Sequence, residues 1–324
     1  YFYYYLNSSQ YGDGSLLWQE NFNGGATLNQ IAINTNDVAA QSGSLSWNNK
    51  QVHTIELQKG VGGKDAQDQS VVIHNEGSQI QGDQVEGFFQ FYLNYYLGQS
   101  LYDKTTVELS LFTQGTGDFL VSASTVDDAA CSGLQTLLQI KTDGALYALG
   151  QLVPDYTWTH EKWHRVAIVL TPTTKKVDVY VDGCCVLSGE LPVLLYGIHR
   201  IKVGYIVKQG TIPPVYYAFD DFKATTGDYS APAMPALTSQ DPAVTVGESN
   251  IVVTREMSIQ DFSAALSTDG VFRVYTYHDY ANEVTGSVAN GNVLVLTNAQ
   301  GTLFRYYTIE TSAAQAATDI LSSS

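Results

Sequence analysis

Basic residues are scarce in this 324-residue chain. It has 16 Lys and Arg against 32 Asp and Glu, which gives a formal net charge of −16. Nucleic-acid-binding proteins need a basic surface, and anionic membrane surfaces attract basic segments, so we expect neither partner. The acidic balance is compatible with cations, with neutral glycans or simply with solubility.

The chain also lacks long apolar runs and has few charges overall. No run approaches the roughly 18 residues of a membrane span. There is no signal peptide and the first residue is Tyr, so we expect the numbering to begin after processing. Charged residues make up 15% of the chain. Globular chains usually carry about 25%. The 22 Tyr residues favour half-buried β surfaces, as expected of an extracellular or cell-surface protein.

Only three cysteines are present, at Cys131, Cys184 and Cys185. An odd number excludes a closed set of intrachain disulfides. Adjacent residues of a strand point to opposite faces, so Cys131 can pair with Cys184 or with Cys185, or all three can be structural core residues. The missing C-x-x-C spacing gives no support for a zinc site.

Helical periodicity is nearly absent, and short alternating runs separated by Gly, Asn and Asp turns fill most of the chain. We predict strands at 87–97, 105–113, 118–124, 137–141, 166–170, 177–181, 201–206 and 215–222. Many short strands with frequent turns are typical of a β-sandwich or jelly roll.

Composition divides the chain into an aromatic segment (1–11), a large β domain (12–225), a linker (226–240), a small domain (241–310) and a tail (311–324). The linker is predicted because Pro and small residues interrupt any periodicity there.

One short helix is expected in the small domain, over about 259–266. Ser258 can cap its first turn, and Asp261 favours its positive end. Strands are expected at 271–277, 293–297 and 303–309, which makes this domain β-rich.

The large domain resembles the concanavalin-like and laminin-G-like jelly rolls over residues 12–225. The resemblance is carried by WQENFNG at 18–24, EKWHRVAIVL at 161–170, KVDVYVDG at 176–183 and YAFDDF at 217–222. It implies a jelly-roll β-sandwich.

The small domain resembles the accessory modules of bacterial surface-layer proteins and polysaccharide lyases. The similar stretches are SIQDFSAAL from residue 258 and NVLVLTNAQGTLFRYYTI from residue 292. This resemblance implies a spacer or attachment role.

Catalytic motifs of related jelly rolls are missing. Glucanases of this fold carry E-x-D-x-x-E on one strand, whereas the strand at 105–113 holds Glu108 as its one carboxylate. The R-x-E-L-R and Q-x-H motifs of alginate lyases are absent, as is G-x-S-x-G. We therefore expect that the protein is not an enzyme.

Two kinds of binding site are candidates. Glu20 or Asn21, with Asp220 or Asp221, would offer hard oxygen ligands for Ca²⁺ that ties the first strand to the last; alternatively, the Asp pair only ends a strand in water. Aromatic platforms for glycans are expected among three further residues: Trp158, Tyr216 and Tyr217.

The N-terminal run is the most unusual local feature. It reads Tyr1, Phe2, Tyr3, Tyr4, Tyr5 and Leu6. Such an uncharged aromatic strand is an aggregation hazard unless it pairs, either with its own domain or as a strand donated to a neighbouring subunit.

Two hypotheses follow for function. The first is a structural or adhesive extracellular protein whose partners are copies of itself, assembled into a filament or layer by N-terminal strand donation. The alternative is a carbohydrate-binding accessory region of a secreted polysaccharide-degrading enzyme, with extracellular glycans as partners.

Overall fold

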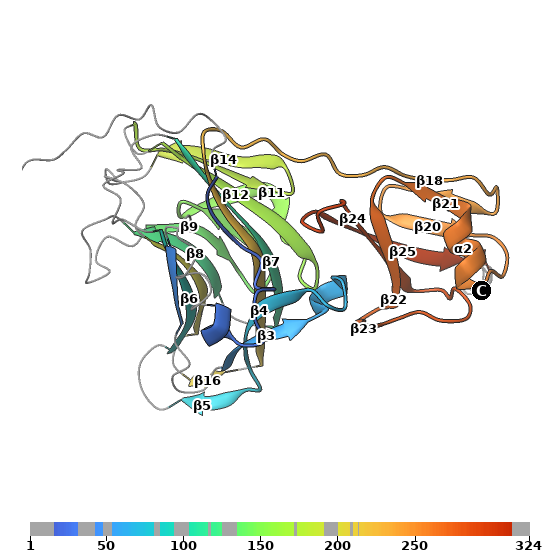
Figure 1. Ribbon diagram of the computed structural model, residues 1–324, viewed down its shortest axis with the longest axis horizontal. Coiled ribbons are helices and arrows are strands. Elements are labelled where there is room, and N and C mark those ends of the chain that lie inside the picture. The colour runs from blue at the N-terminus through green and yellow to red at the C-terminus, as the bar shows by residue number, and fades with distance from the viewer. Residues whose placement is uncertain are drawn as a thin grey trace, which may run out of the picture. The chain divides into compact units, whose positions relative to one another are not determined.

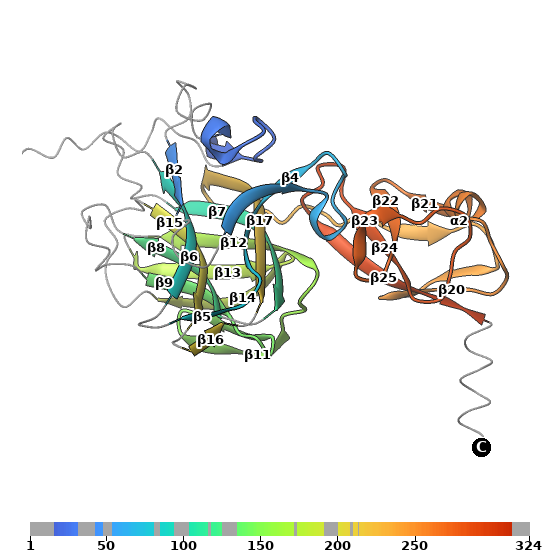
Figure 2. The ribbon, with the colours of Figure 1, turned by 90° about the horizontal axis from the view of Figure 1, so that it is seen from below.

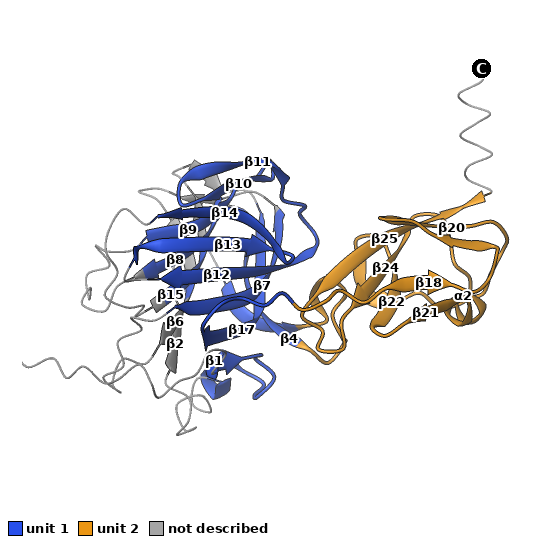
Figure 3. Cartoon of the chain, turned by 90° about the horizontal axis from the view of Figure 1, so that it is seen from above, with its two compact units in different colours: residues 1–58, 69–231 blue, residues 59–68, 232–324 orange. Residues whose placement is uncertain are grey.

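The computed structural model confirms the predicted all-β fold (Figure 1). It describes residues 16–31, 43–47, 54–80, 85–93, 104–115, 118–124, 135–171, 174–190, 200–207, 210–212 and 214–312. The chain forms two compact units, shown in Figure 3. Unit 1 comprises Tyr1–Gln58 and Gln69–Ala231, and unit 2 comprises Lys59–Asp68 and Pro232–Ser324. Among the described residues, no helix has the length and apolar character needed to cross a membrane.

Unit 1 is a β-sandwich of two large antiparallel sheets (Figures 1 and 2). The first sheet has the order β14 (Cys184–Glu190), β13 (Lys176–Val181), β12 (Trp163–Thr171), β7 (Thr105–Gly115), β17 (Val215–Thr226), β4 (Gln69–Asn75) and β3 (Thr54–Lys59), with β1 (Leu16–Glu20) also paired to β17. The second sheet has the order β11 (Gln151–Thr157), β10 (Ala145–Ala148), β9 (Gln135–Ile140), β8 (Asp118–Ser124), β15 (Arg200–Val207), β6 (Val85–Leu93) and β2 (Gly43–Trp47). The short strands β5 (Ser78–Ile80) and β16 (Gly210–Ile212) form a separate pair.

The core of unit 1 lies between these sheets because alternate residues of each strand point inward. In β8, Phe119 and Val121 are buried while Asp118 stays partly exposed. They share one apolar cluster with residues of the first sheet such as Ile168 and Phe219. The alternation read from the sequence therefore selects which side chains form the core.

Unit 2 is built on one six-stranded sheet. Its order is β19 (Val244–Val246), β20 (Asn250–Val253), β25 (Phe304–Thr311), β24 (Asn292–Thr297), β22 (Val271–Thr276) and β23 (Asp279–Glu283), and β18 (Leu237–Ser239) pairs separately with β21 (Leu266–Thr268). Helix α2 (Ile259–Ala265) buries Phe262 against Leu294 and other core residues. Ser258 accepts a hydrogen bond from the Asp261 amide, which confirms the predicted helix start.

Residues 59–68 run from the last residue of β3 to the residue before β4, but they belong to unit 2. The sequence interpretation placed them in the large domain. Two buried tyrosines hold this segment: the Tyr306 hydroxyl donates to the Gly62 carbonyl at 2.8 Å, and the Tyr275 hydroxyl donates to the Gly63 carbonyl at 3.4 Å. Both glycines have positive φ, a conformation that residues with a Cβ rarely adopt.

Candidate functional site

Two of the three predicted glycan-binding residues are buried. Tyr217 is 0% exposed and packs on Phe119, with ring centroids 4.7 Å apart. Trp158 is 1% exposed, and its indole nitrogen donates to the Thr113 hydroxyl at 2.9 Å. The prediction that these two rings are glycan platforms is therefore wrong, since both are core residues. Tyr217 is in the core because it lies on the inner face of β17.

Tyr216 lies on the opposite, outer face of β17 and remains partly exposed. Its hydroxyl donates to the Gln58 side-chain oxygen at 2.8 Å. Phe112 of β7 packs edge-on against its ring, with an interplanar angle of 82°. Burial, followed by the Glu56 charge, raises the pKa of the Tyr216 hydroxyl, so this group stays protonated and keeps its donor role.

His74 and Glu56 complete the surroundings of Tyr216. His74 pairs with Tyr216 across β4 and β17, and their ring centroids are 6.4 Å apart. A ring nitrogen of His74 lies 3.1 Å from the Glu56 carboxylate. On the other side, the exposed Gln114 of β7 faces Tyr216 in register. We call these five residues (Glu56, Gln58, His74, Gln114 and Tyr216) the Tyr216 ledge.

The ledge combines a fixed aromatic ring with carboxylate, amide and imidazole groups. Such a set can pack on the C–H face of a sugar ring and exchange hydrogen bonds with its hydroxyls. Of these residues, Tyr216 was predicted from the sequence, whereas Glu56, Gln58 and His74 were not. The available signal was the alternation of TIELQ at 54–58, where Ile55 is buried and Glu56 is exposed.

The residues predicted to bind calcium are brought together only in part. Strand pairing sets Glu20 opposite Phe222, next to Asp221 in sequence. The carboxylate of Glu20, however, accepts the Phe22 amide at 2.7 Å, and the side chain of Asn21 accepts the Asn23 amide at 3.2 Å. Both groups thus stabilise the turn that follows β1.

The second half of the predicted calcium site is occupied in a similar way. Buried Asp220 accepts the Ser70 hydroxyl at 2.8 Å and the Asp221 amide at 2.7 Å. Asp221 lies at a β-bulge with positive φ and accepts the Ser110 hydroxyl at 3.3 Å. Within the described ranges, no group of three or more His, Cys, Asp or Glu side chains could hold a metal ion. The calcium site stays a prediction.

Glu108, the one carboxylate of β7, forms an ion pair with Arg165. The Arg165 guanidinium lies 3.2 Å from Glu108, and both side chains are largely buried. Removing one partner of a buried ion pair strongly destabilises the folded protein, so we interpret Glu108 as a structural residue.

Three further predictions concern the cysteines and the N-terminus. Cys184 and Cys185 are exposed on the edge strand β14, so the core role considered for them is wrong. Cys131 and the segment Tyr1–Leu6 lie outside the described residues. Disulfide pairing and strand donation therefore stay predictions.

Comparison with known proteins assigns no family, since neither a family model nor a curated protein matches this chain. Similar solved structures include a sialidase with 13% identity and a TM-score of 0.48; the match covers 67% of this chain and 19% of the sialidase chain. A carbohydrate esterase of Shiga toxin-encoding bacteriophage phi24B has 12% identity and a TM-score of 0.42; the match covers 66% of this chain and 100% of the esterase chain. A family GH16 endo-β-1,3(4)-glucanase has 8% identity and a TM-score of 0.42; the match covers 66% of this chain and 92% of the glucanase chain. The chain thus spans about a fifth of the sialidase, and the likeness concerns the β-sandwich fold.

These similarities correct one expectation. The missing motifs led us to expect that the protein is not an enzyme, but the structures named above are a sialidase, an esterase and a glucanase. The absence of a known motif therefore does not exclude catalysis by this chain.

Proposed function

We propose that unit 1 binds an uncharged glycan through the Tyr216 ledge, as a carbohydrate-binding region of a secreted protein that acts on polysaccharides. The observation that carries the proposal is the partly exposed Tyr216 ring, whose hydroxyl is fixed by Gln58. A ring held in place before the ligand arrives loses little conformational entropy on binding.

The electrostatics of the ledge support the choice of an uncharged ligand. Glu56 lies within the ledge, and the exposed Glu76 lies 3.8 Å from the His74 ring. The whole chain carries a formal charge of −16. Uronic or sialic acids would meet repulsion here, whereas neutral hydroxyls can both donate to and accept from these side chains.

The test compares Tyr216→Ala with Tyr147→Ala on a panel of neutral and acidic plant and algal polysaccharides, using isothermal titration calorimetry. Tyr147 is a matched control because it is also partly exposed but lies on β10 of the second sheet. We expect saturable binding of a neutral polysaccharide, weakened about tenfold or more by Tyr216→Ala and unchanged by Tyr147→Ala.

Two results would contradict the proposal. Unchanged affinity in a correctly folded Tyr216→Ala variant would remove the ledge from the binding site. Tighter binding of acidic than of neutral polysaccharides would overturn the ligand class.

A further inference from the structure

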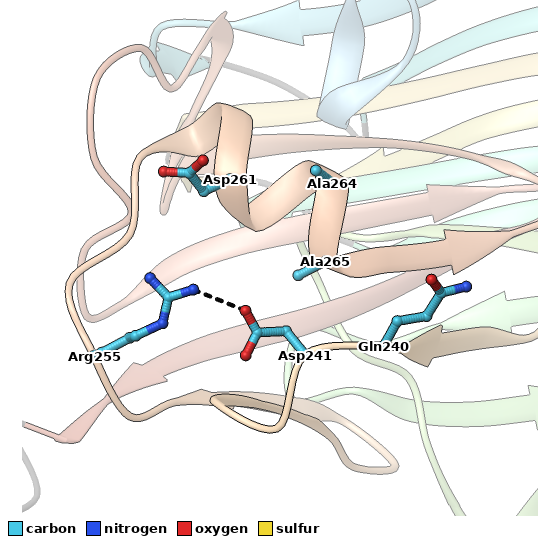
Figure 4. A pocket seen from close by; sticks show the side chains of 6 residues that line it. All are labelled: Gln240, Asp241, Arg255, Asp261, Ala264 and Ala265. Carbon is cyan, nitrogen blue, oxygen red and sulfur yellow. Dashed lines mark hydrogen bonds and ion pairs between the residues drawn. The ribbon is translucent and has the colours of Figure 1, made fainter.

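We infer that unit 2 has a separate pocket that takes a small, uncharged ring bearing adjacent hydroxyls, of the size of one sugar residue. The inference does not rest on the Tyr216 ledge, which belongs to unit 1. It rests on the pocket shown in Figure 4, with a volume of about 250 Å³. Its lining residues are Gln240, Asp241, Arg255, Asp261, Ala264 and Ala265.

Three elements bring the polar residues together. Gln240 and Asp241 directly follow β18, Arg255 lies two residues after β20, and Asp261 is in the first turn of α2. The pocket is open to solvent, and its volume is nearer to that of one sugar ring than to that of an extended oligosaccharide.

Asp241 is held in a fixed orientation at one side of the pocket. One carboxylate oxygen accepts the Ala243 amide at 2.8 Å, and the other accepts from the Arg255 guanidinium at 2.8 Å, which Figure 4 marks as a dashed line. The Ala243 amide, and next Arg255, lower the pKa of the Asp241 carboxyl. At neutral pH this group therefore remains an acceptor.

The pocket lining offers both donors and acceptors. The side chain of Arg255 is 54% exposed, and Asp241 contacts one of its terminal nitrogens. A guanidinium has five N–H donors in all, so donors remain for a ligand. One Asp261 oxygen accepts the Ser258 hydroxyl at 2.7 Å, which fixes the carboxylate. Adjacent hydroxyls, each both donor and acceptor, can pair with these groups.

The charge of the pocket argues against other ligand classes. Two carboxylates and one guanidinium sum to −1, which repels carboxylates and phosphates. A hard cation prefers several oxygen ligands and would have to compete with the Arg255 guanidinium for Asp241. Ala264 and Ala265 add a small apolar surface without filling the space, as needed for the C–H groups of a sugar.

The experiment is saturation-transfer difference NMR on the full chain carrying Tyr216→Ala, which removes the ledge as a second binding site, with methyl glycosides of glucose, galactose and mannose as probes. We expect transfer to at least one probe. Ala264→Leu should weaken it, since a larger side chain at a lining position narrows the pocket while every polar group remains. Asp261→Asn should weaken the affinity by about tenfold, because a carboxylate acceptor is replaced by a neutral amide.

The controls separate this site from the ledge and from loss of folding. Arg305→Gln, made in the same Tyr216→Ala background, alters an exposed arginine of β25 in the same unit and should not change the transfer. If transfer occurs in the unaltered chain but is absent in Tyr216→Ala, the probe binds at the ledge only and the pocket inference is wrong. No transfer with any probe, or stronger transfer to glucuronate than to methyl glucoside, would also overturn it. Thermal unfolding of Ala264→Leu checks that the variant is folded.

Discussion

The two units bury their tyrosines in different ways. In unit 1, Tyr217 lies in the core, and its hydroxyl has no hydrogen-bond partner among the described residues. In unit 2, the buried hydroxyls of Tyr275 and Tyr306 donate to the backbone of residues 59–68. The same residue type thus fills apolar space in one unit and holds a remote chain segment in the other.

This difference shows what a buried hydroxyl contributes. A hydroxyl without a partner costs desolvation free energy, whereas a satisfied one adds a small net stabilisation and fixes geometry. The contact in unit 2 further depends on two positive-φ glycines that let the backbone approach the rings. Three variants test whether the segment 59–68 is held as specifically as this comparison implies.

The largest effect is expected from Gly63→Ala. A Cβ at this position would lie 2.9 Å from a Val295 methyl carbon and 3.3 Å from the Tyr275 ring, at a φ of +87°. Left-handed strain and overpacking together should lower the free energy of unfolding of unit 2 by about 3 kcal/mol. Urea denaturation measures this change.

Gly60→Ala is the matched control for that variant. Gly60 also has positive φ, but the nearest heavy atom to its added Cβ lies 3.6 Å away. Strain alone should cost about 1 kcal/mol. Equal losses in the two variants would mean that the ring contact at Gly63 is unimportant.

A smaller effect is expected from removing single hydroxyls. Tyr306→Phe should destabilise unit 2 by about 1 kcal/mol. It should also increase hydrogen exchange within residues 59–68, since the Gly62 carbonyl loses its donor. Tyr217→Phe removes a hydroxyl without a partner among the described residues, so unit 1 should keep its stability or gain slightly. Destabilisation of similar size in both variants would refute the contrast between the units.

The smallest effect is expected from Asp65→Asn. Asp65 forms an ion pair with Arg273, which also lies 3.3 Å from Glu283. Exposed ion pairs contribute little, so the loss should be below about 1 kcal/mol. A double-mutant cycle with Arg273→Gln isolates the pairwise contribution, and a coupling above about 2 kcal/mol would show that charge, rather than the tyrosines, holds the segment.

Much of the fold could be predicted from local patterns. The predicted strands at 105–113, 118–124 and 177–181 correspond closely to β7, β8 and β13. The strands β3 and β4 were not predicted, because a glycine-rich stretch interrupts the alternation between them. Because β3 and β4 were not predicted, Glu56, Gln58 and His74 were not recognised as neighbours of Tyr216.

The binding candidates depend on contacts that local sequence patterns do not contain. Tyr216 and Tyr217 are adjacent and chemically identical, and only the pairing of β17 with β4 and β7 determines which ring faces outward. Similarly, the unit 2 pocket joins residues after β18 and β20 with residues of α2, and no local pattern connects these segments.

Local sequence patterns specify the β character of this protein and the start of α2, because alternation and capping act between near neighbours along the chain. Three other properties arise only in the folded chain: which tyrosines are exposed, the inclusion of residues 59–68 in unit 2, and which polar groups share a pocket. Those properties depend on strand register and on contacts between segments that are separated in sequence, such as Gly62 and Tyr306. The free energy of packing the whole chain, rather than the local conformational preference of each segment, determines these properties.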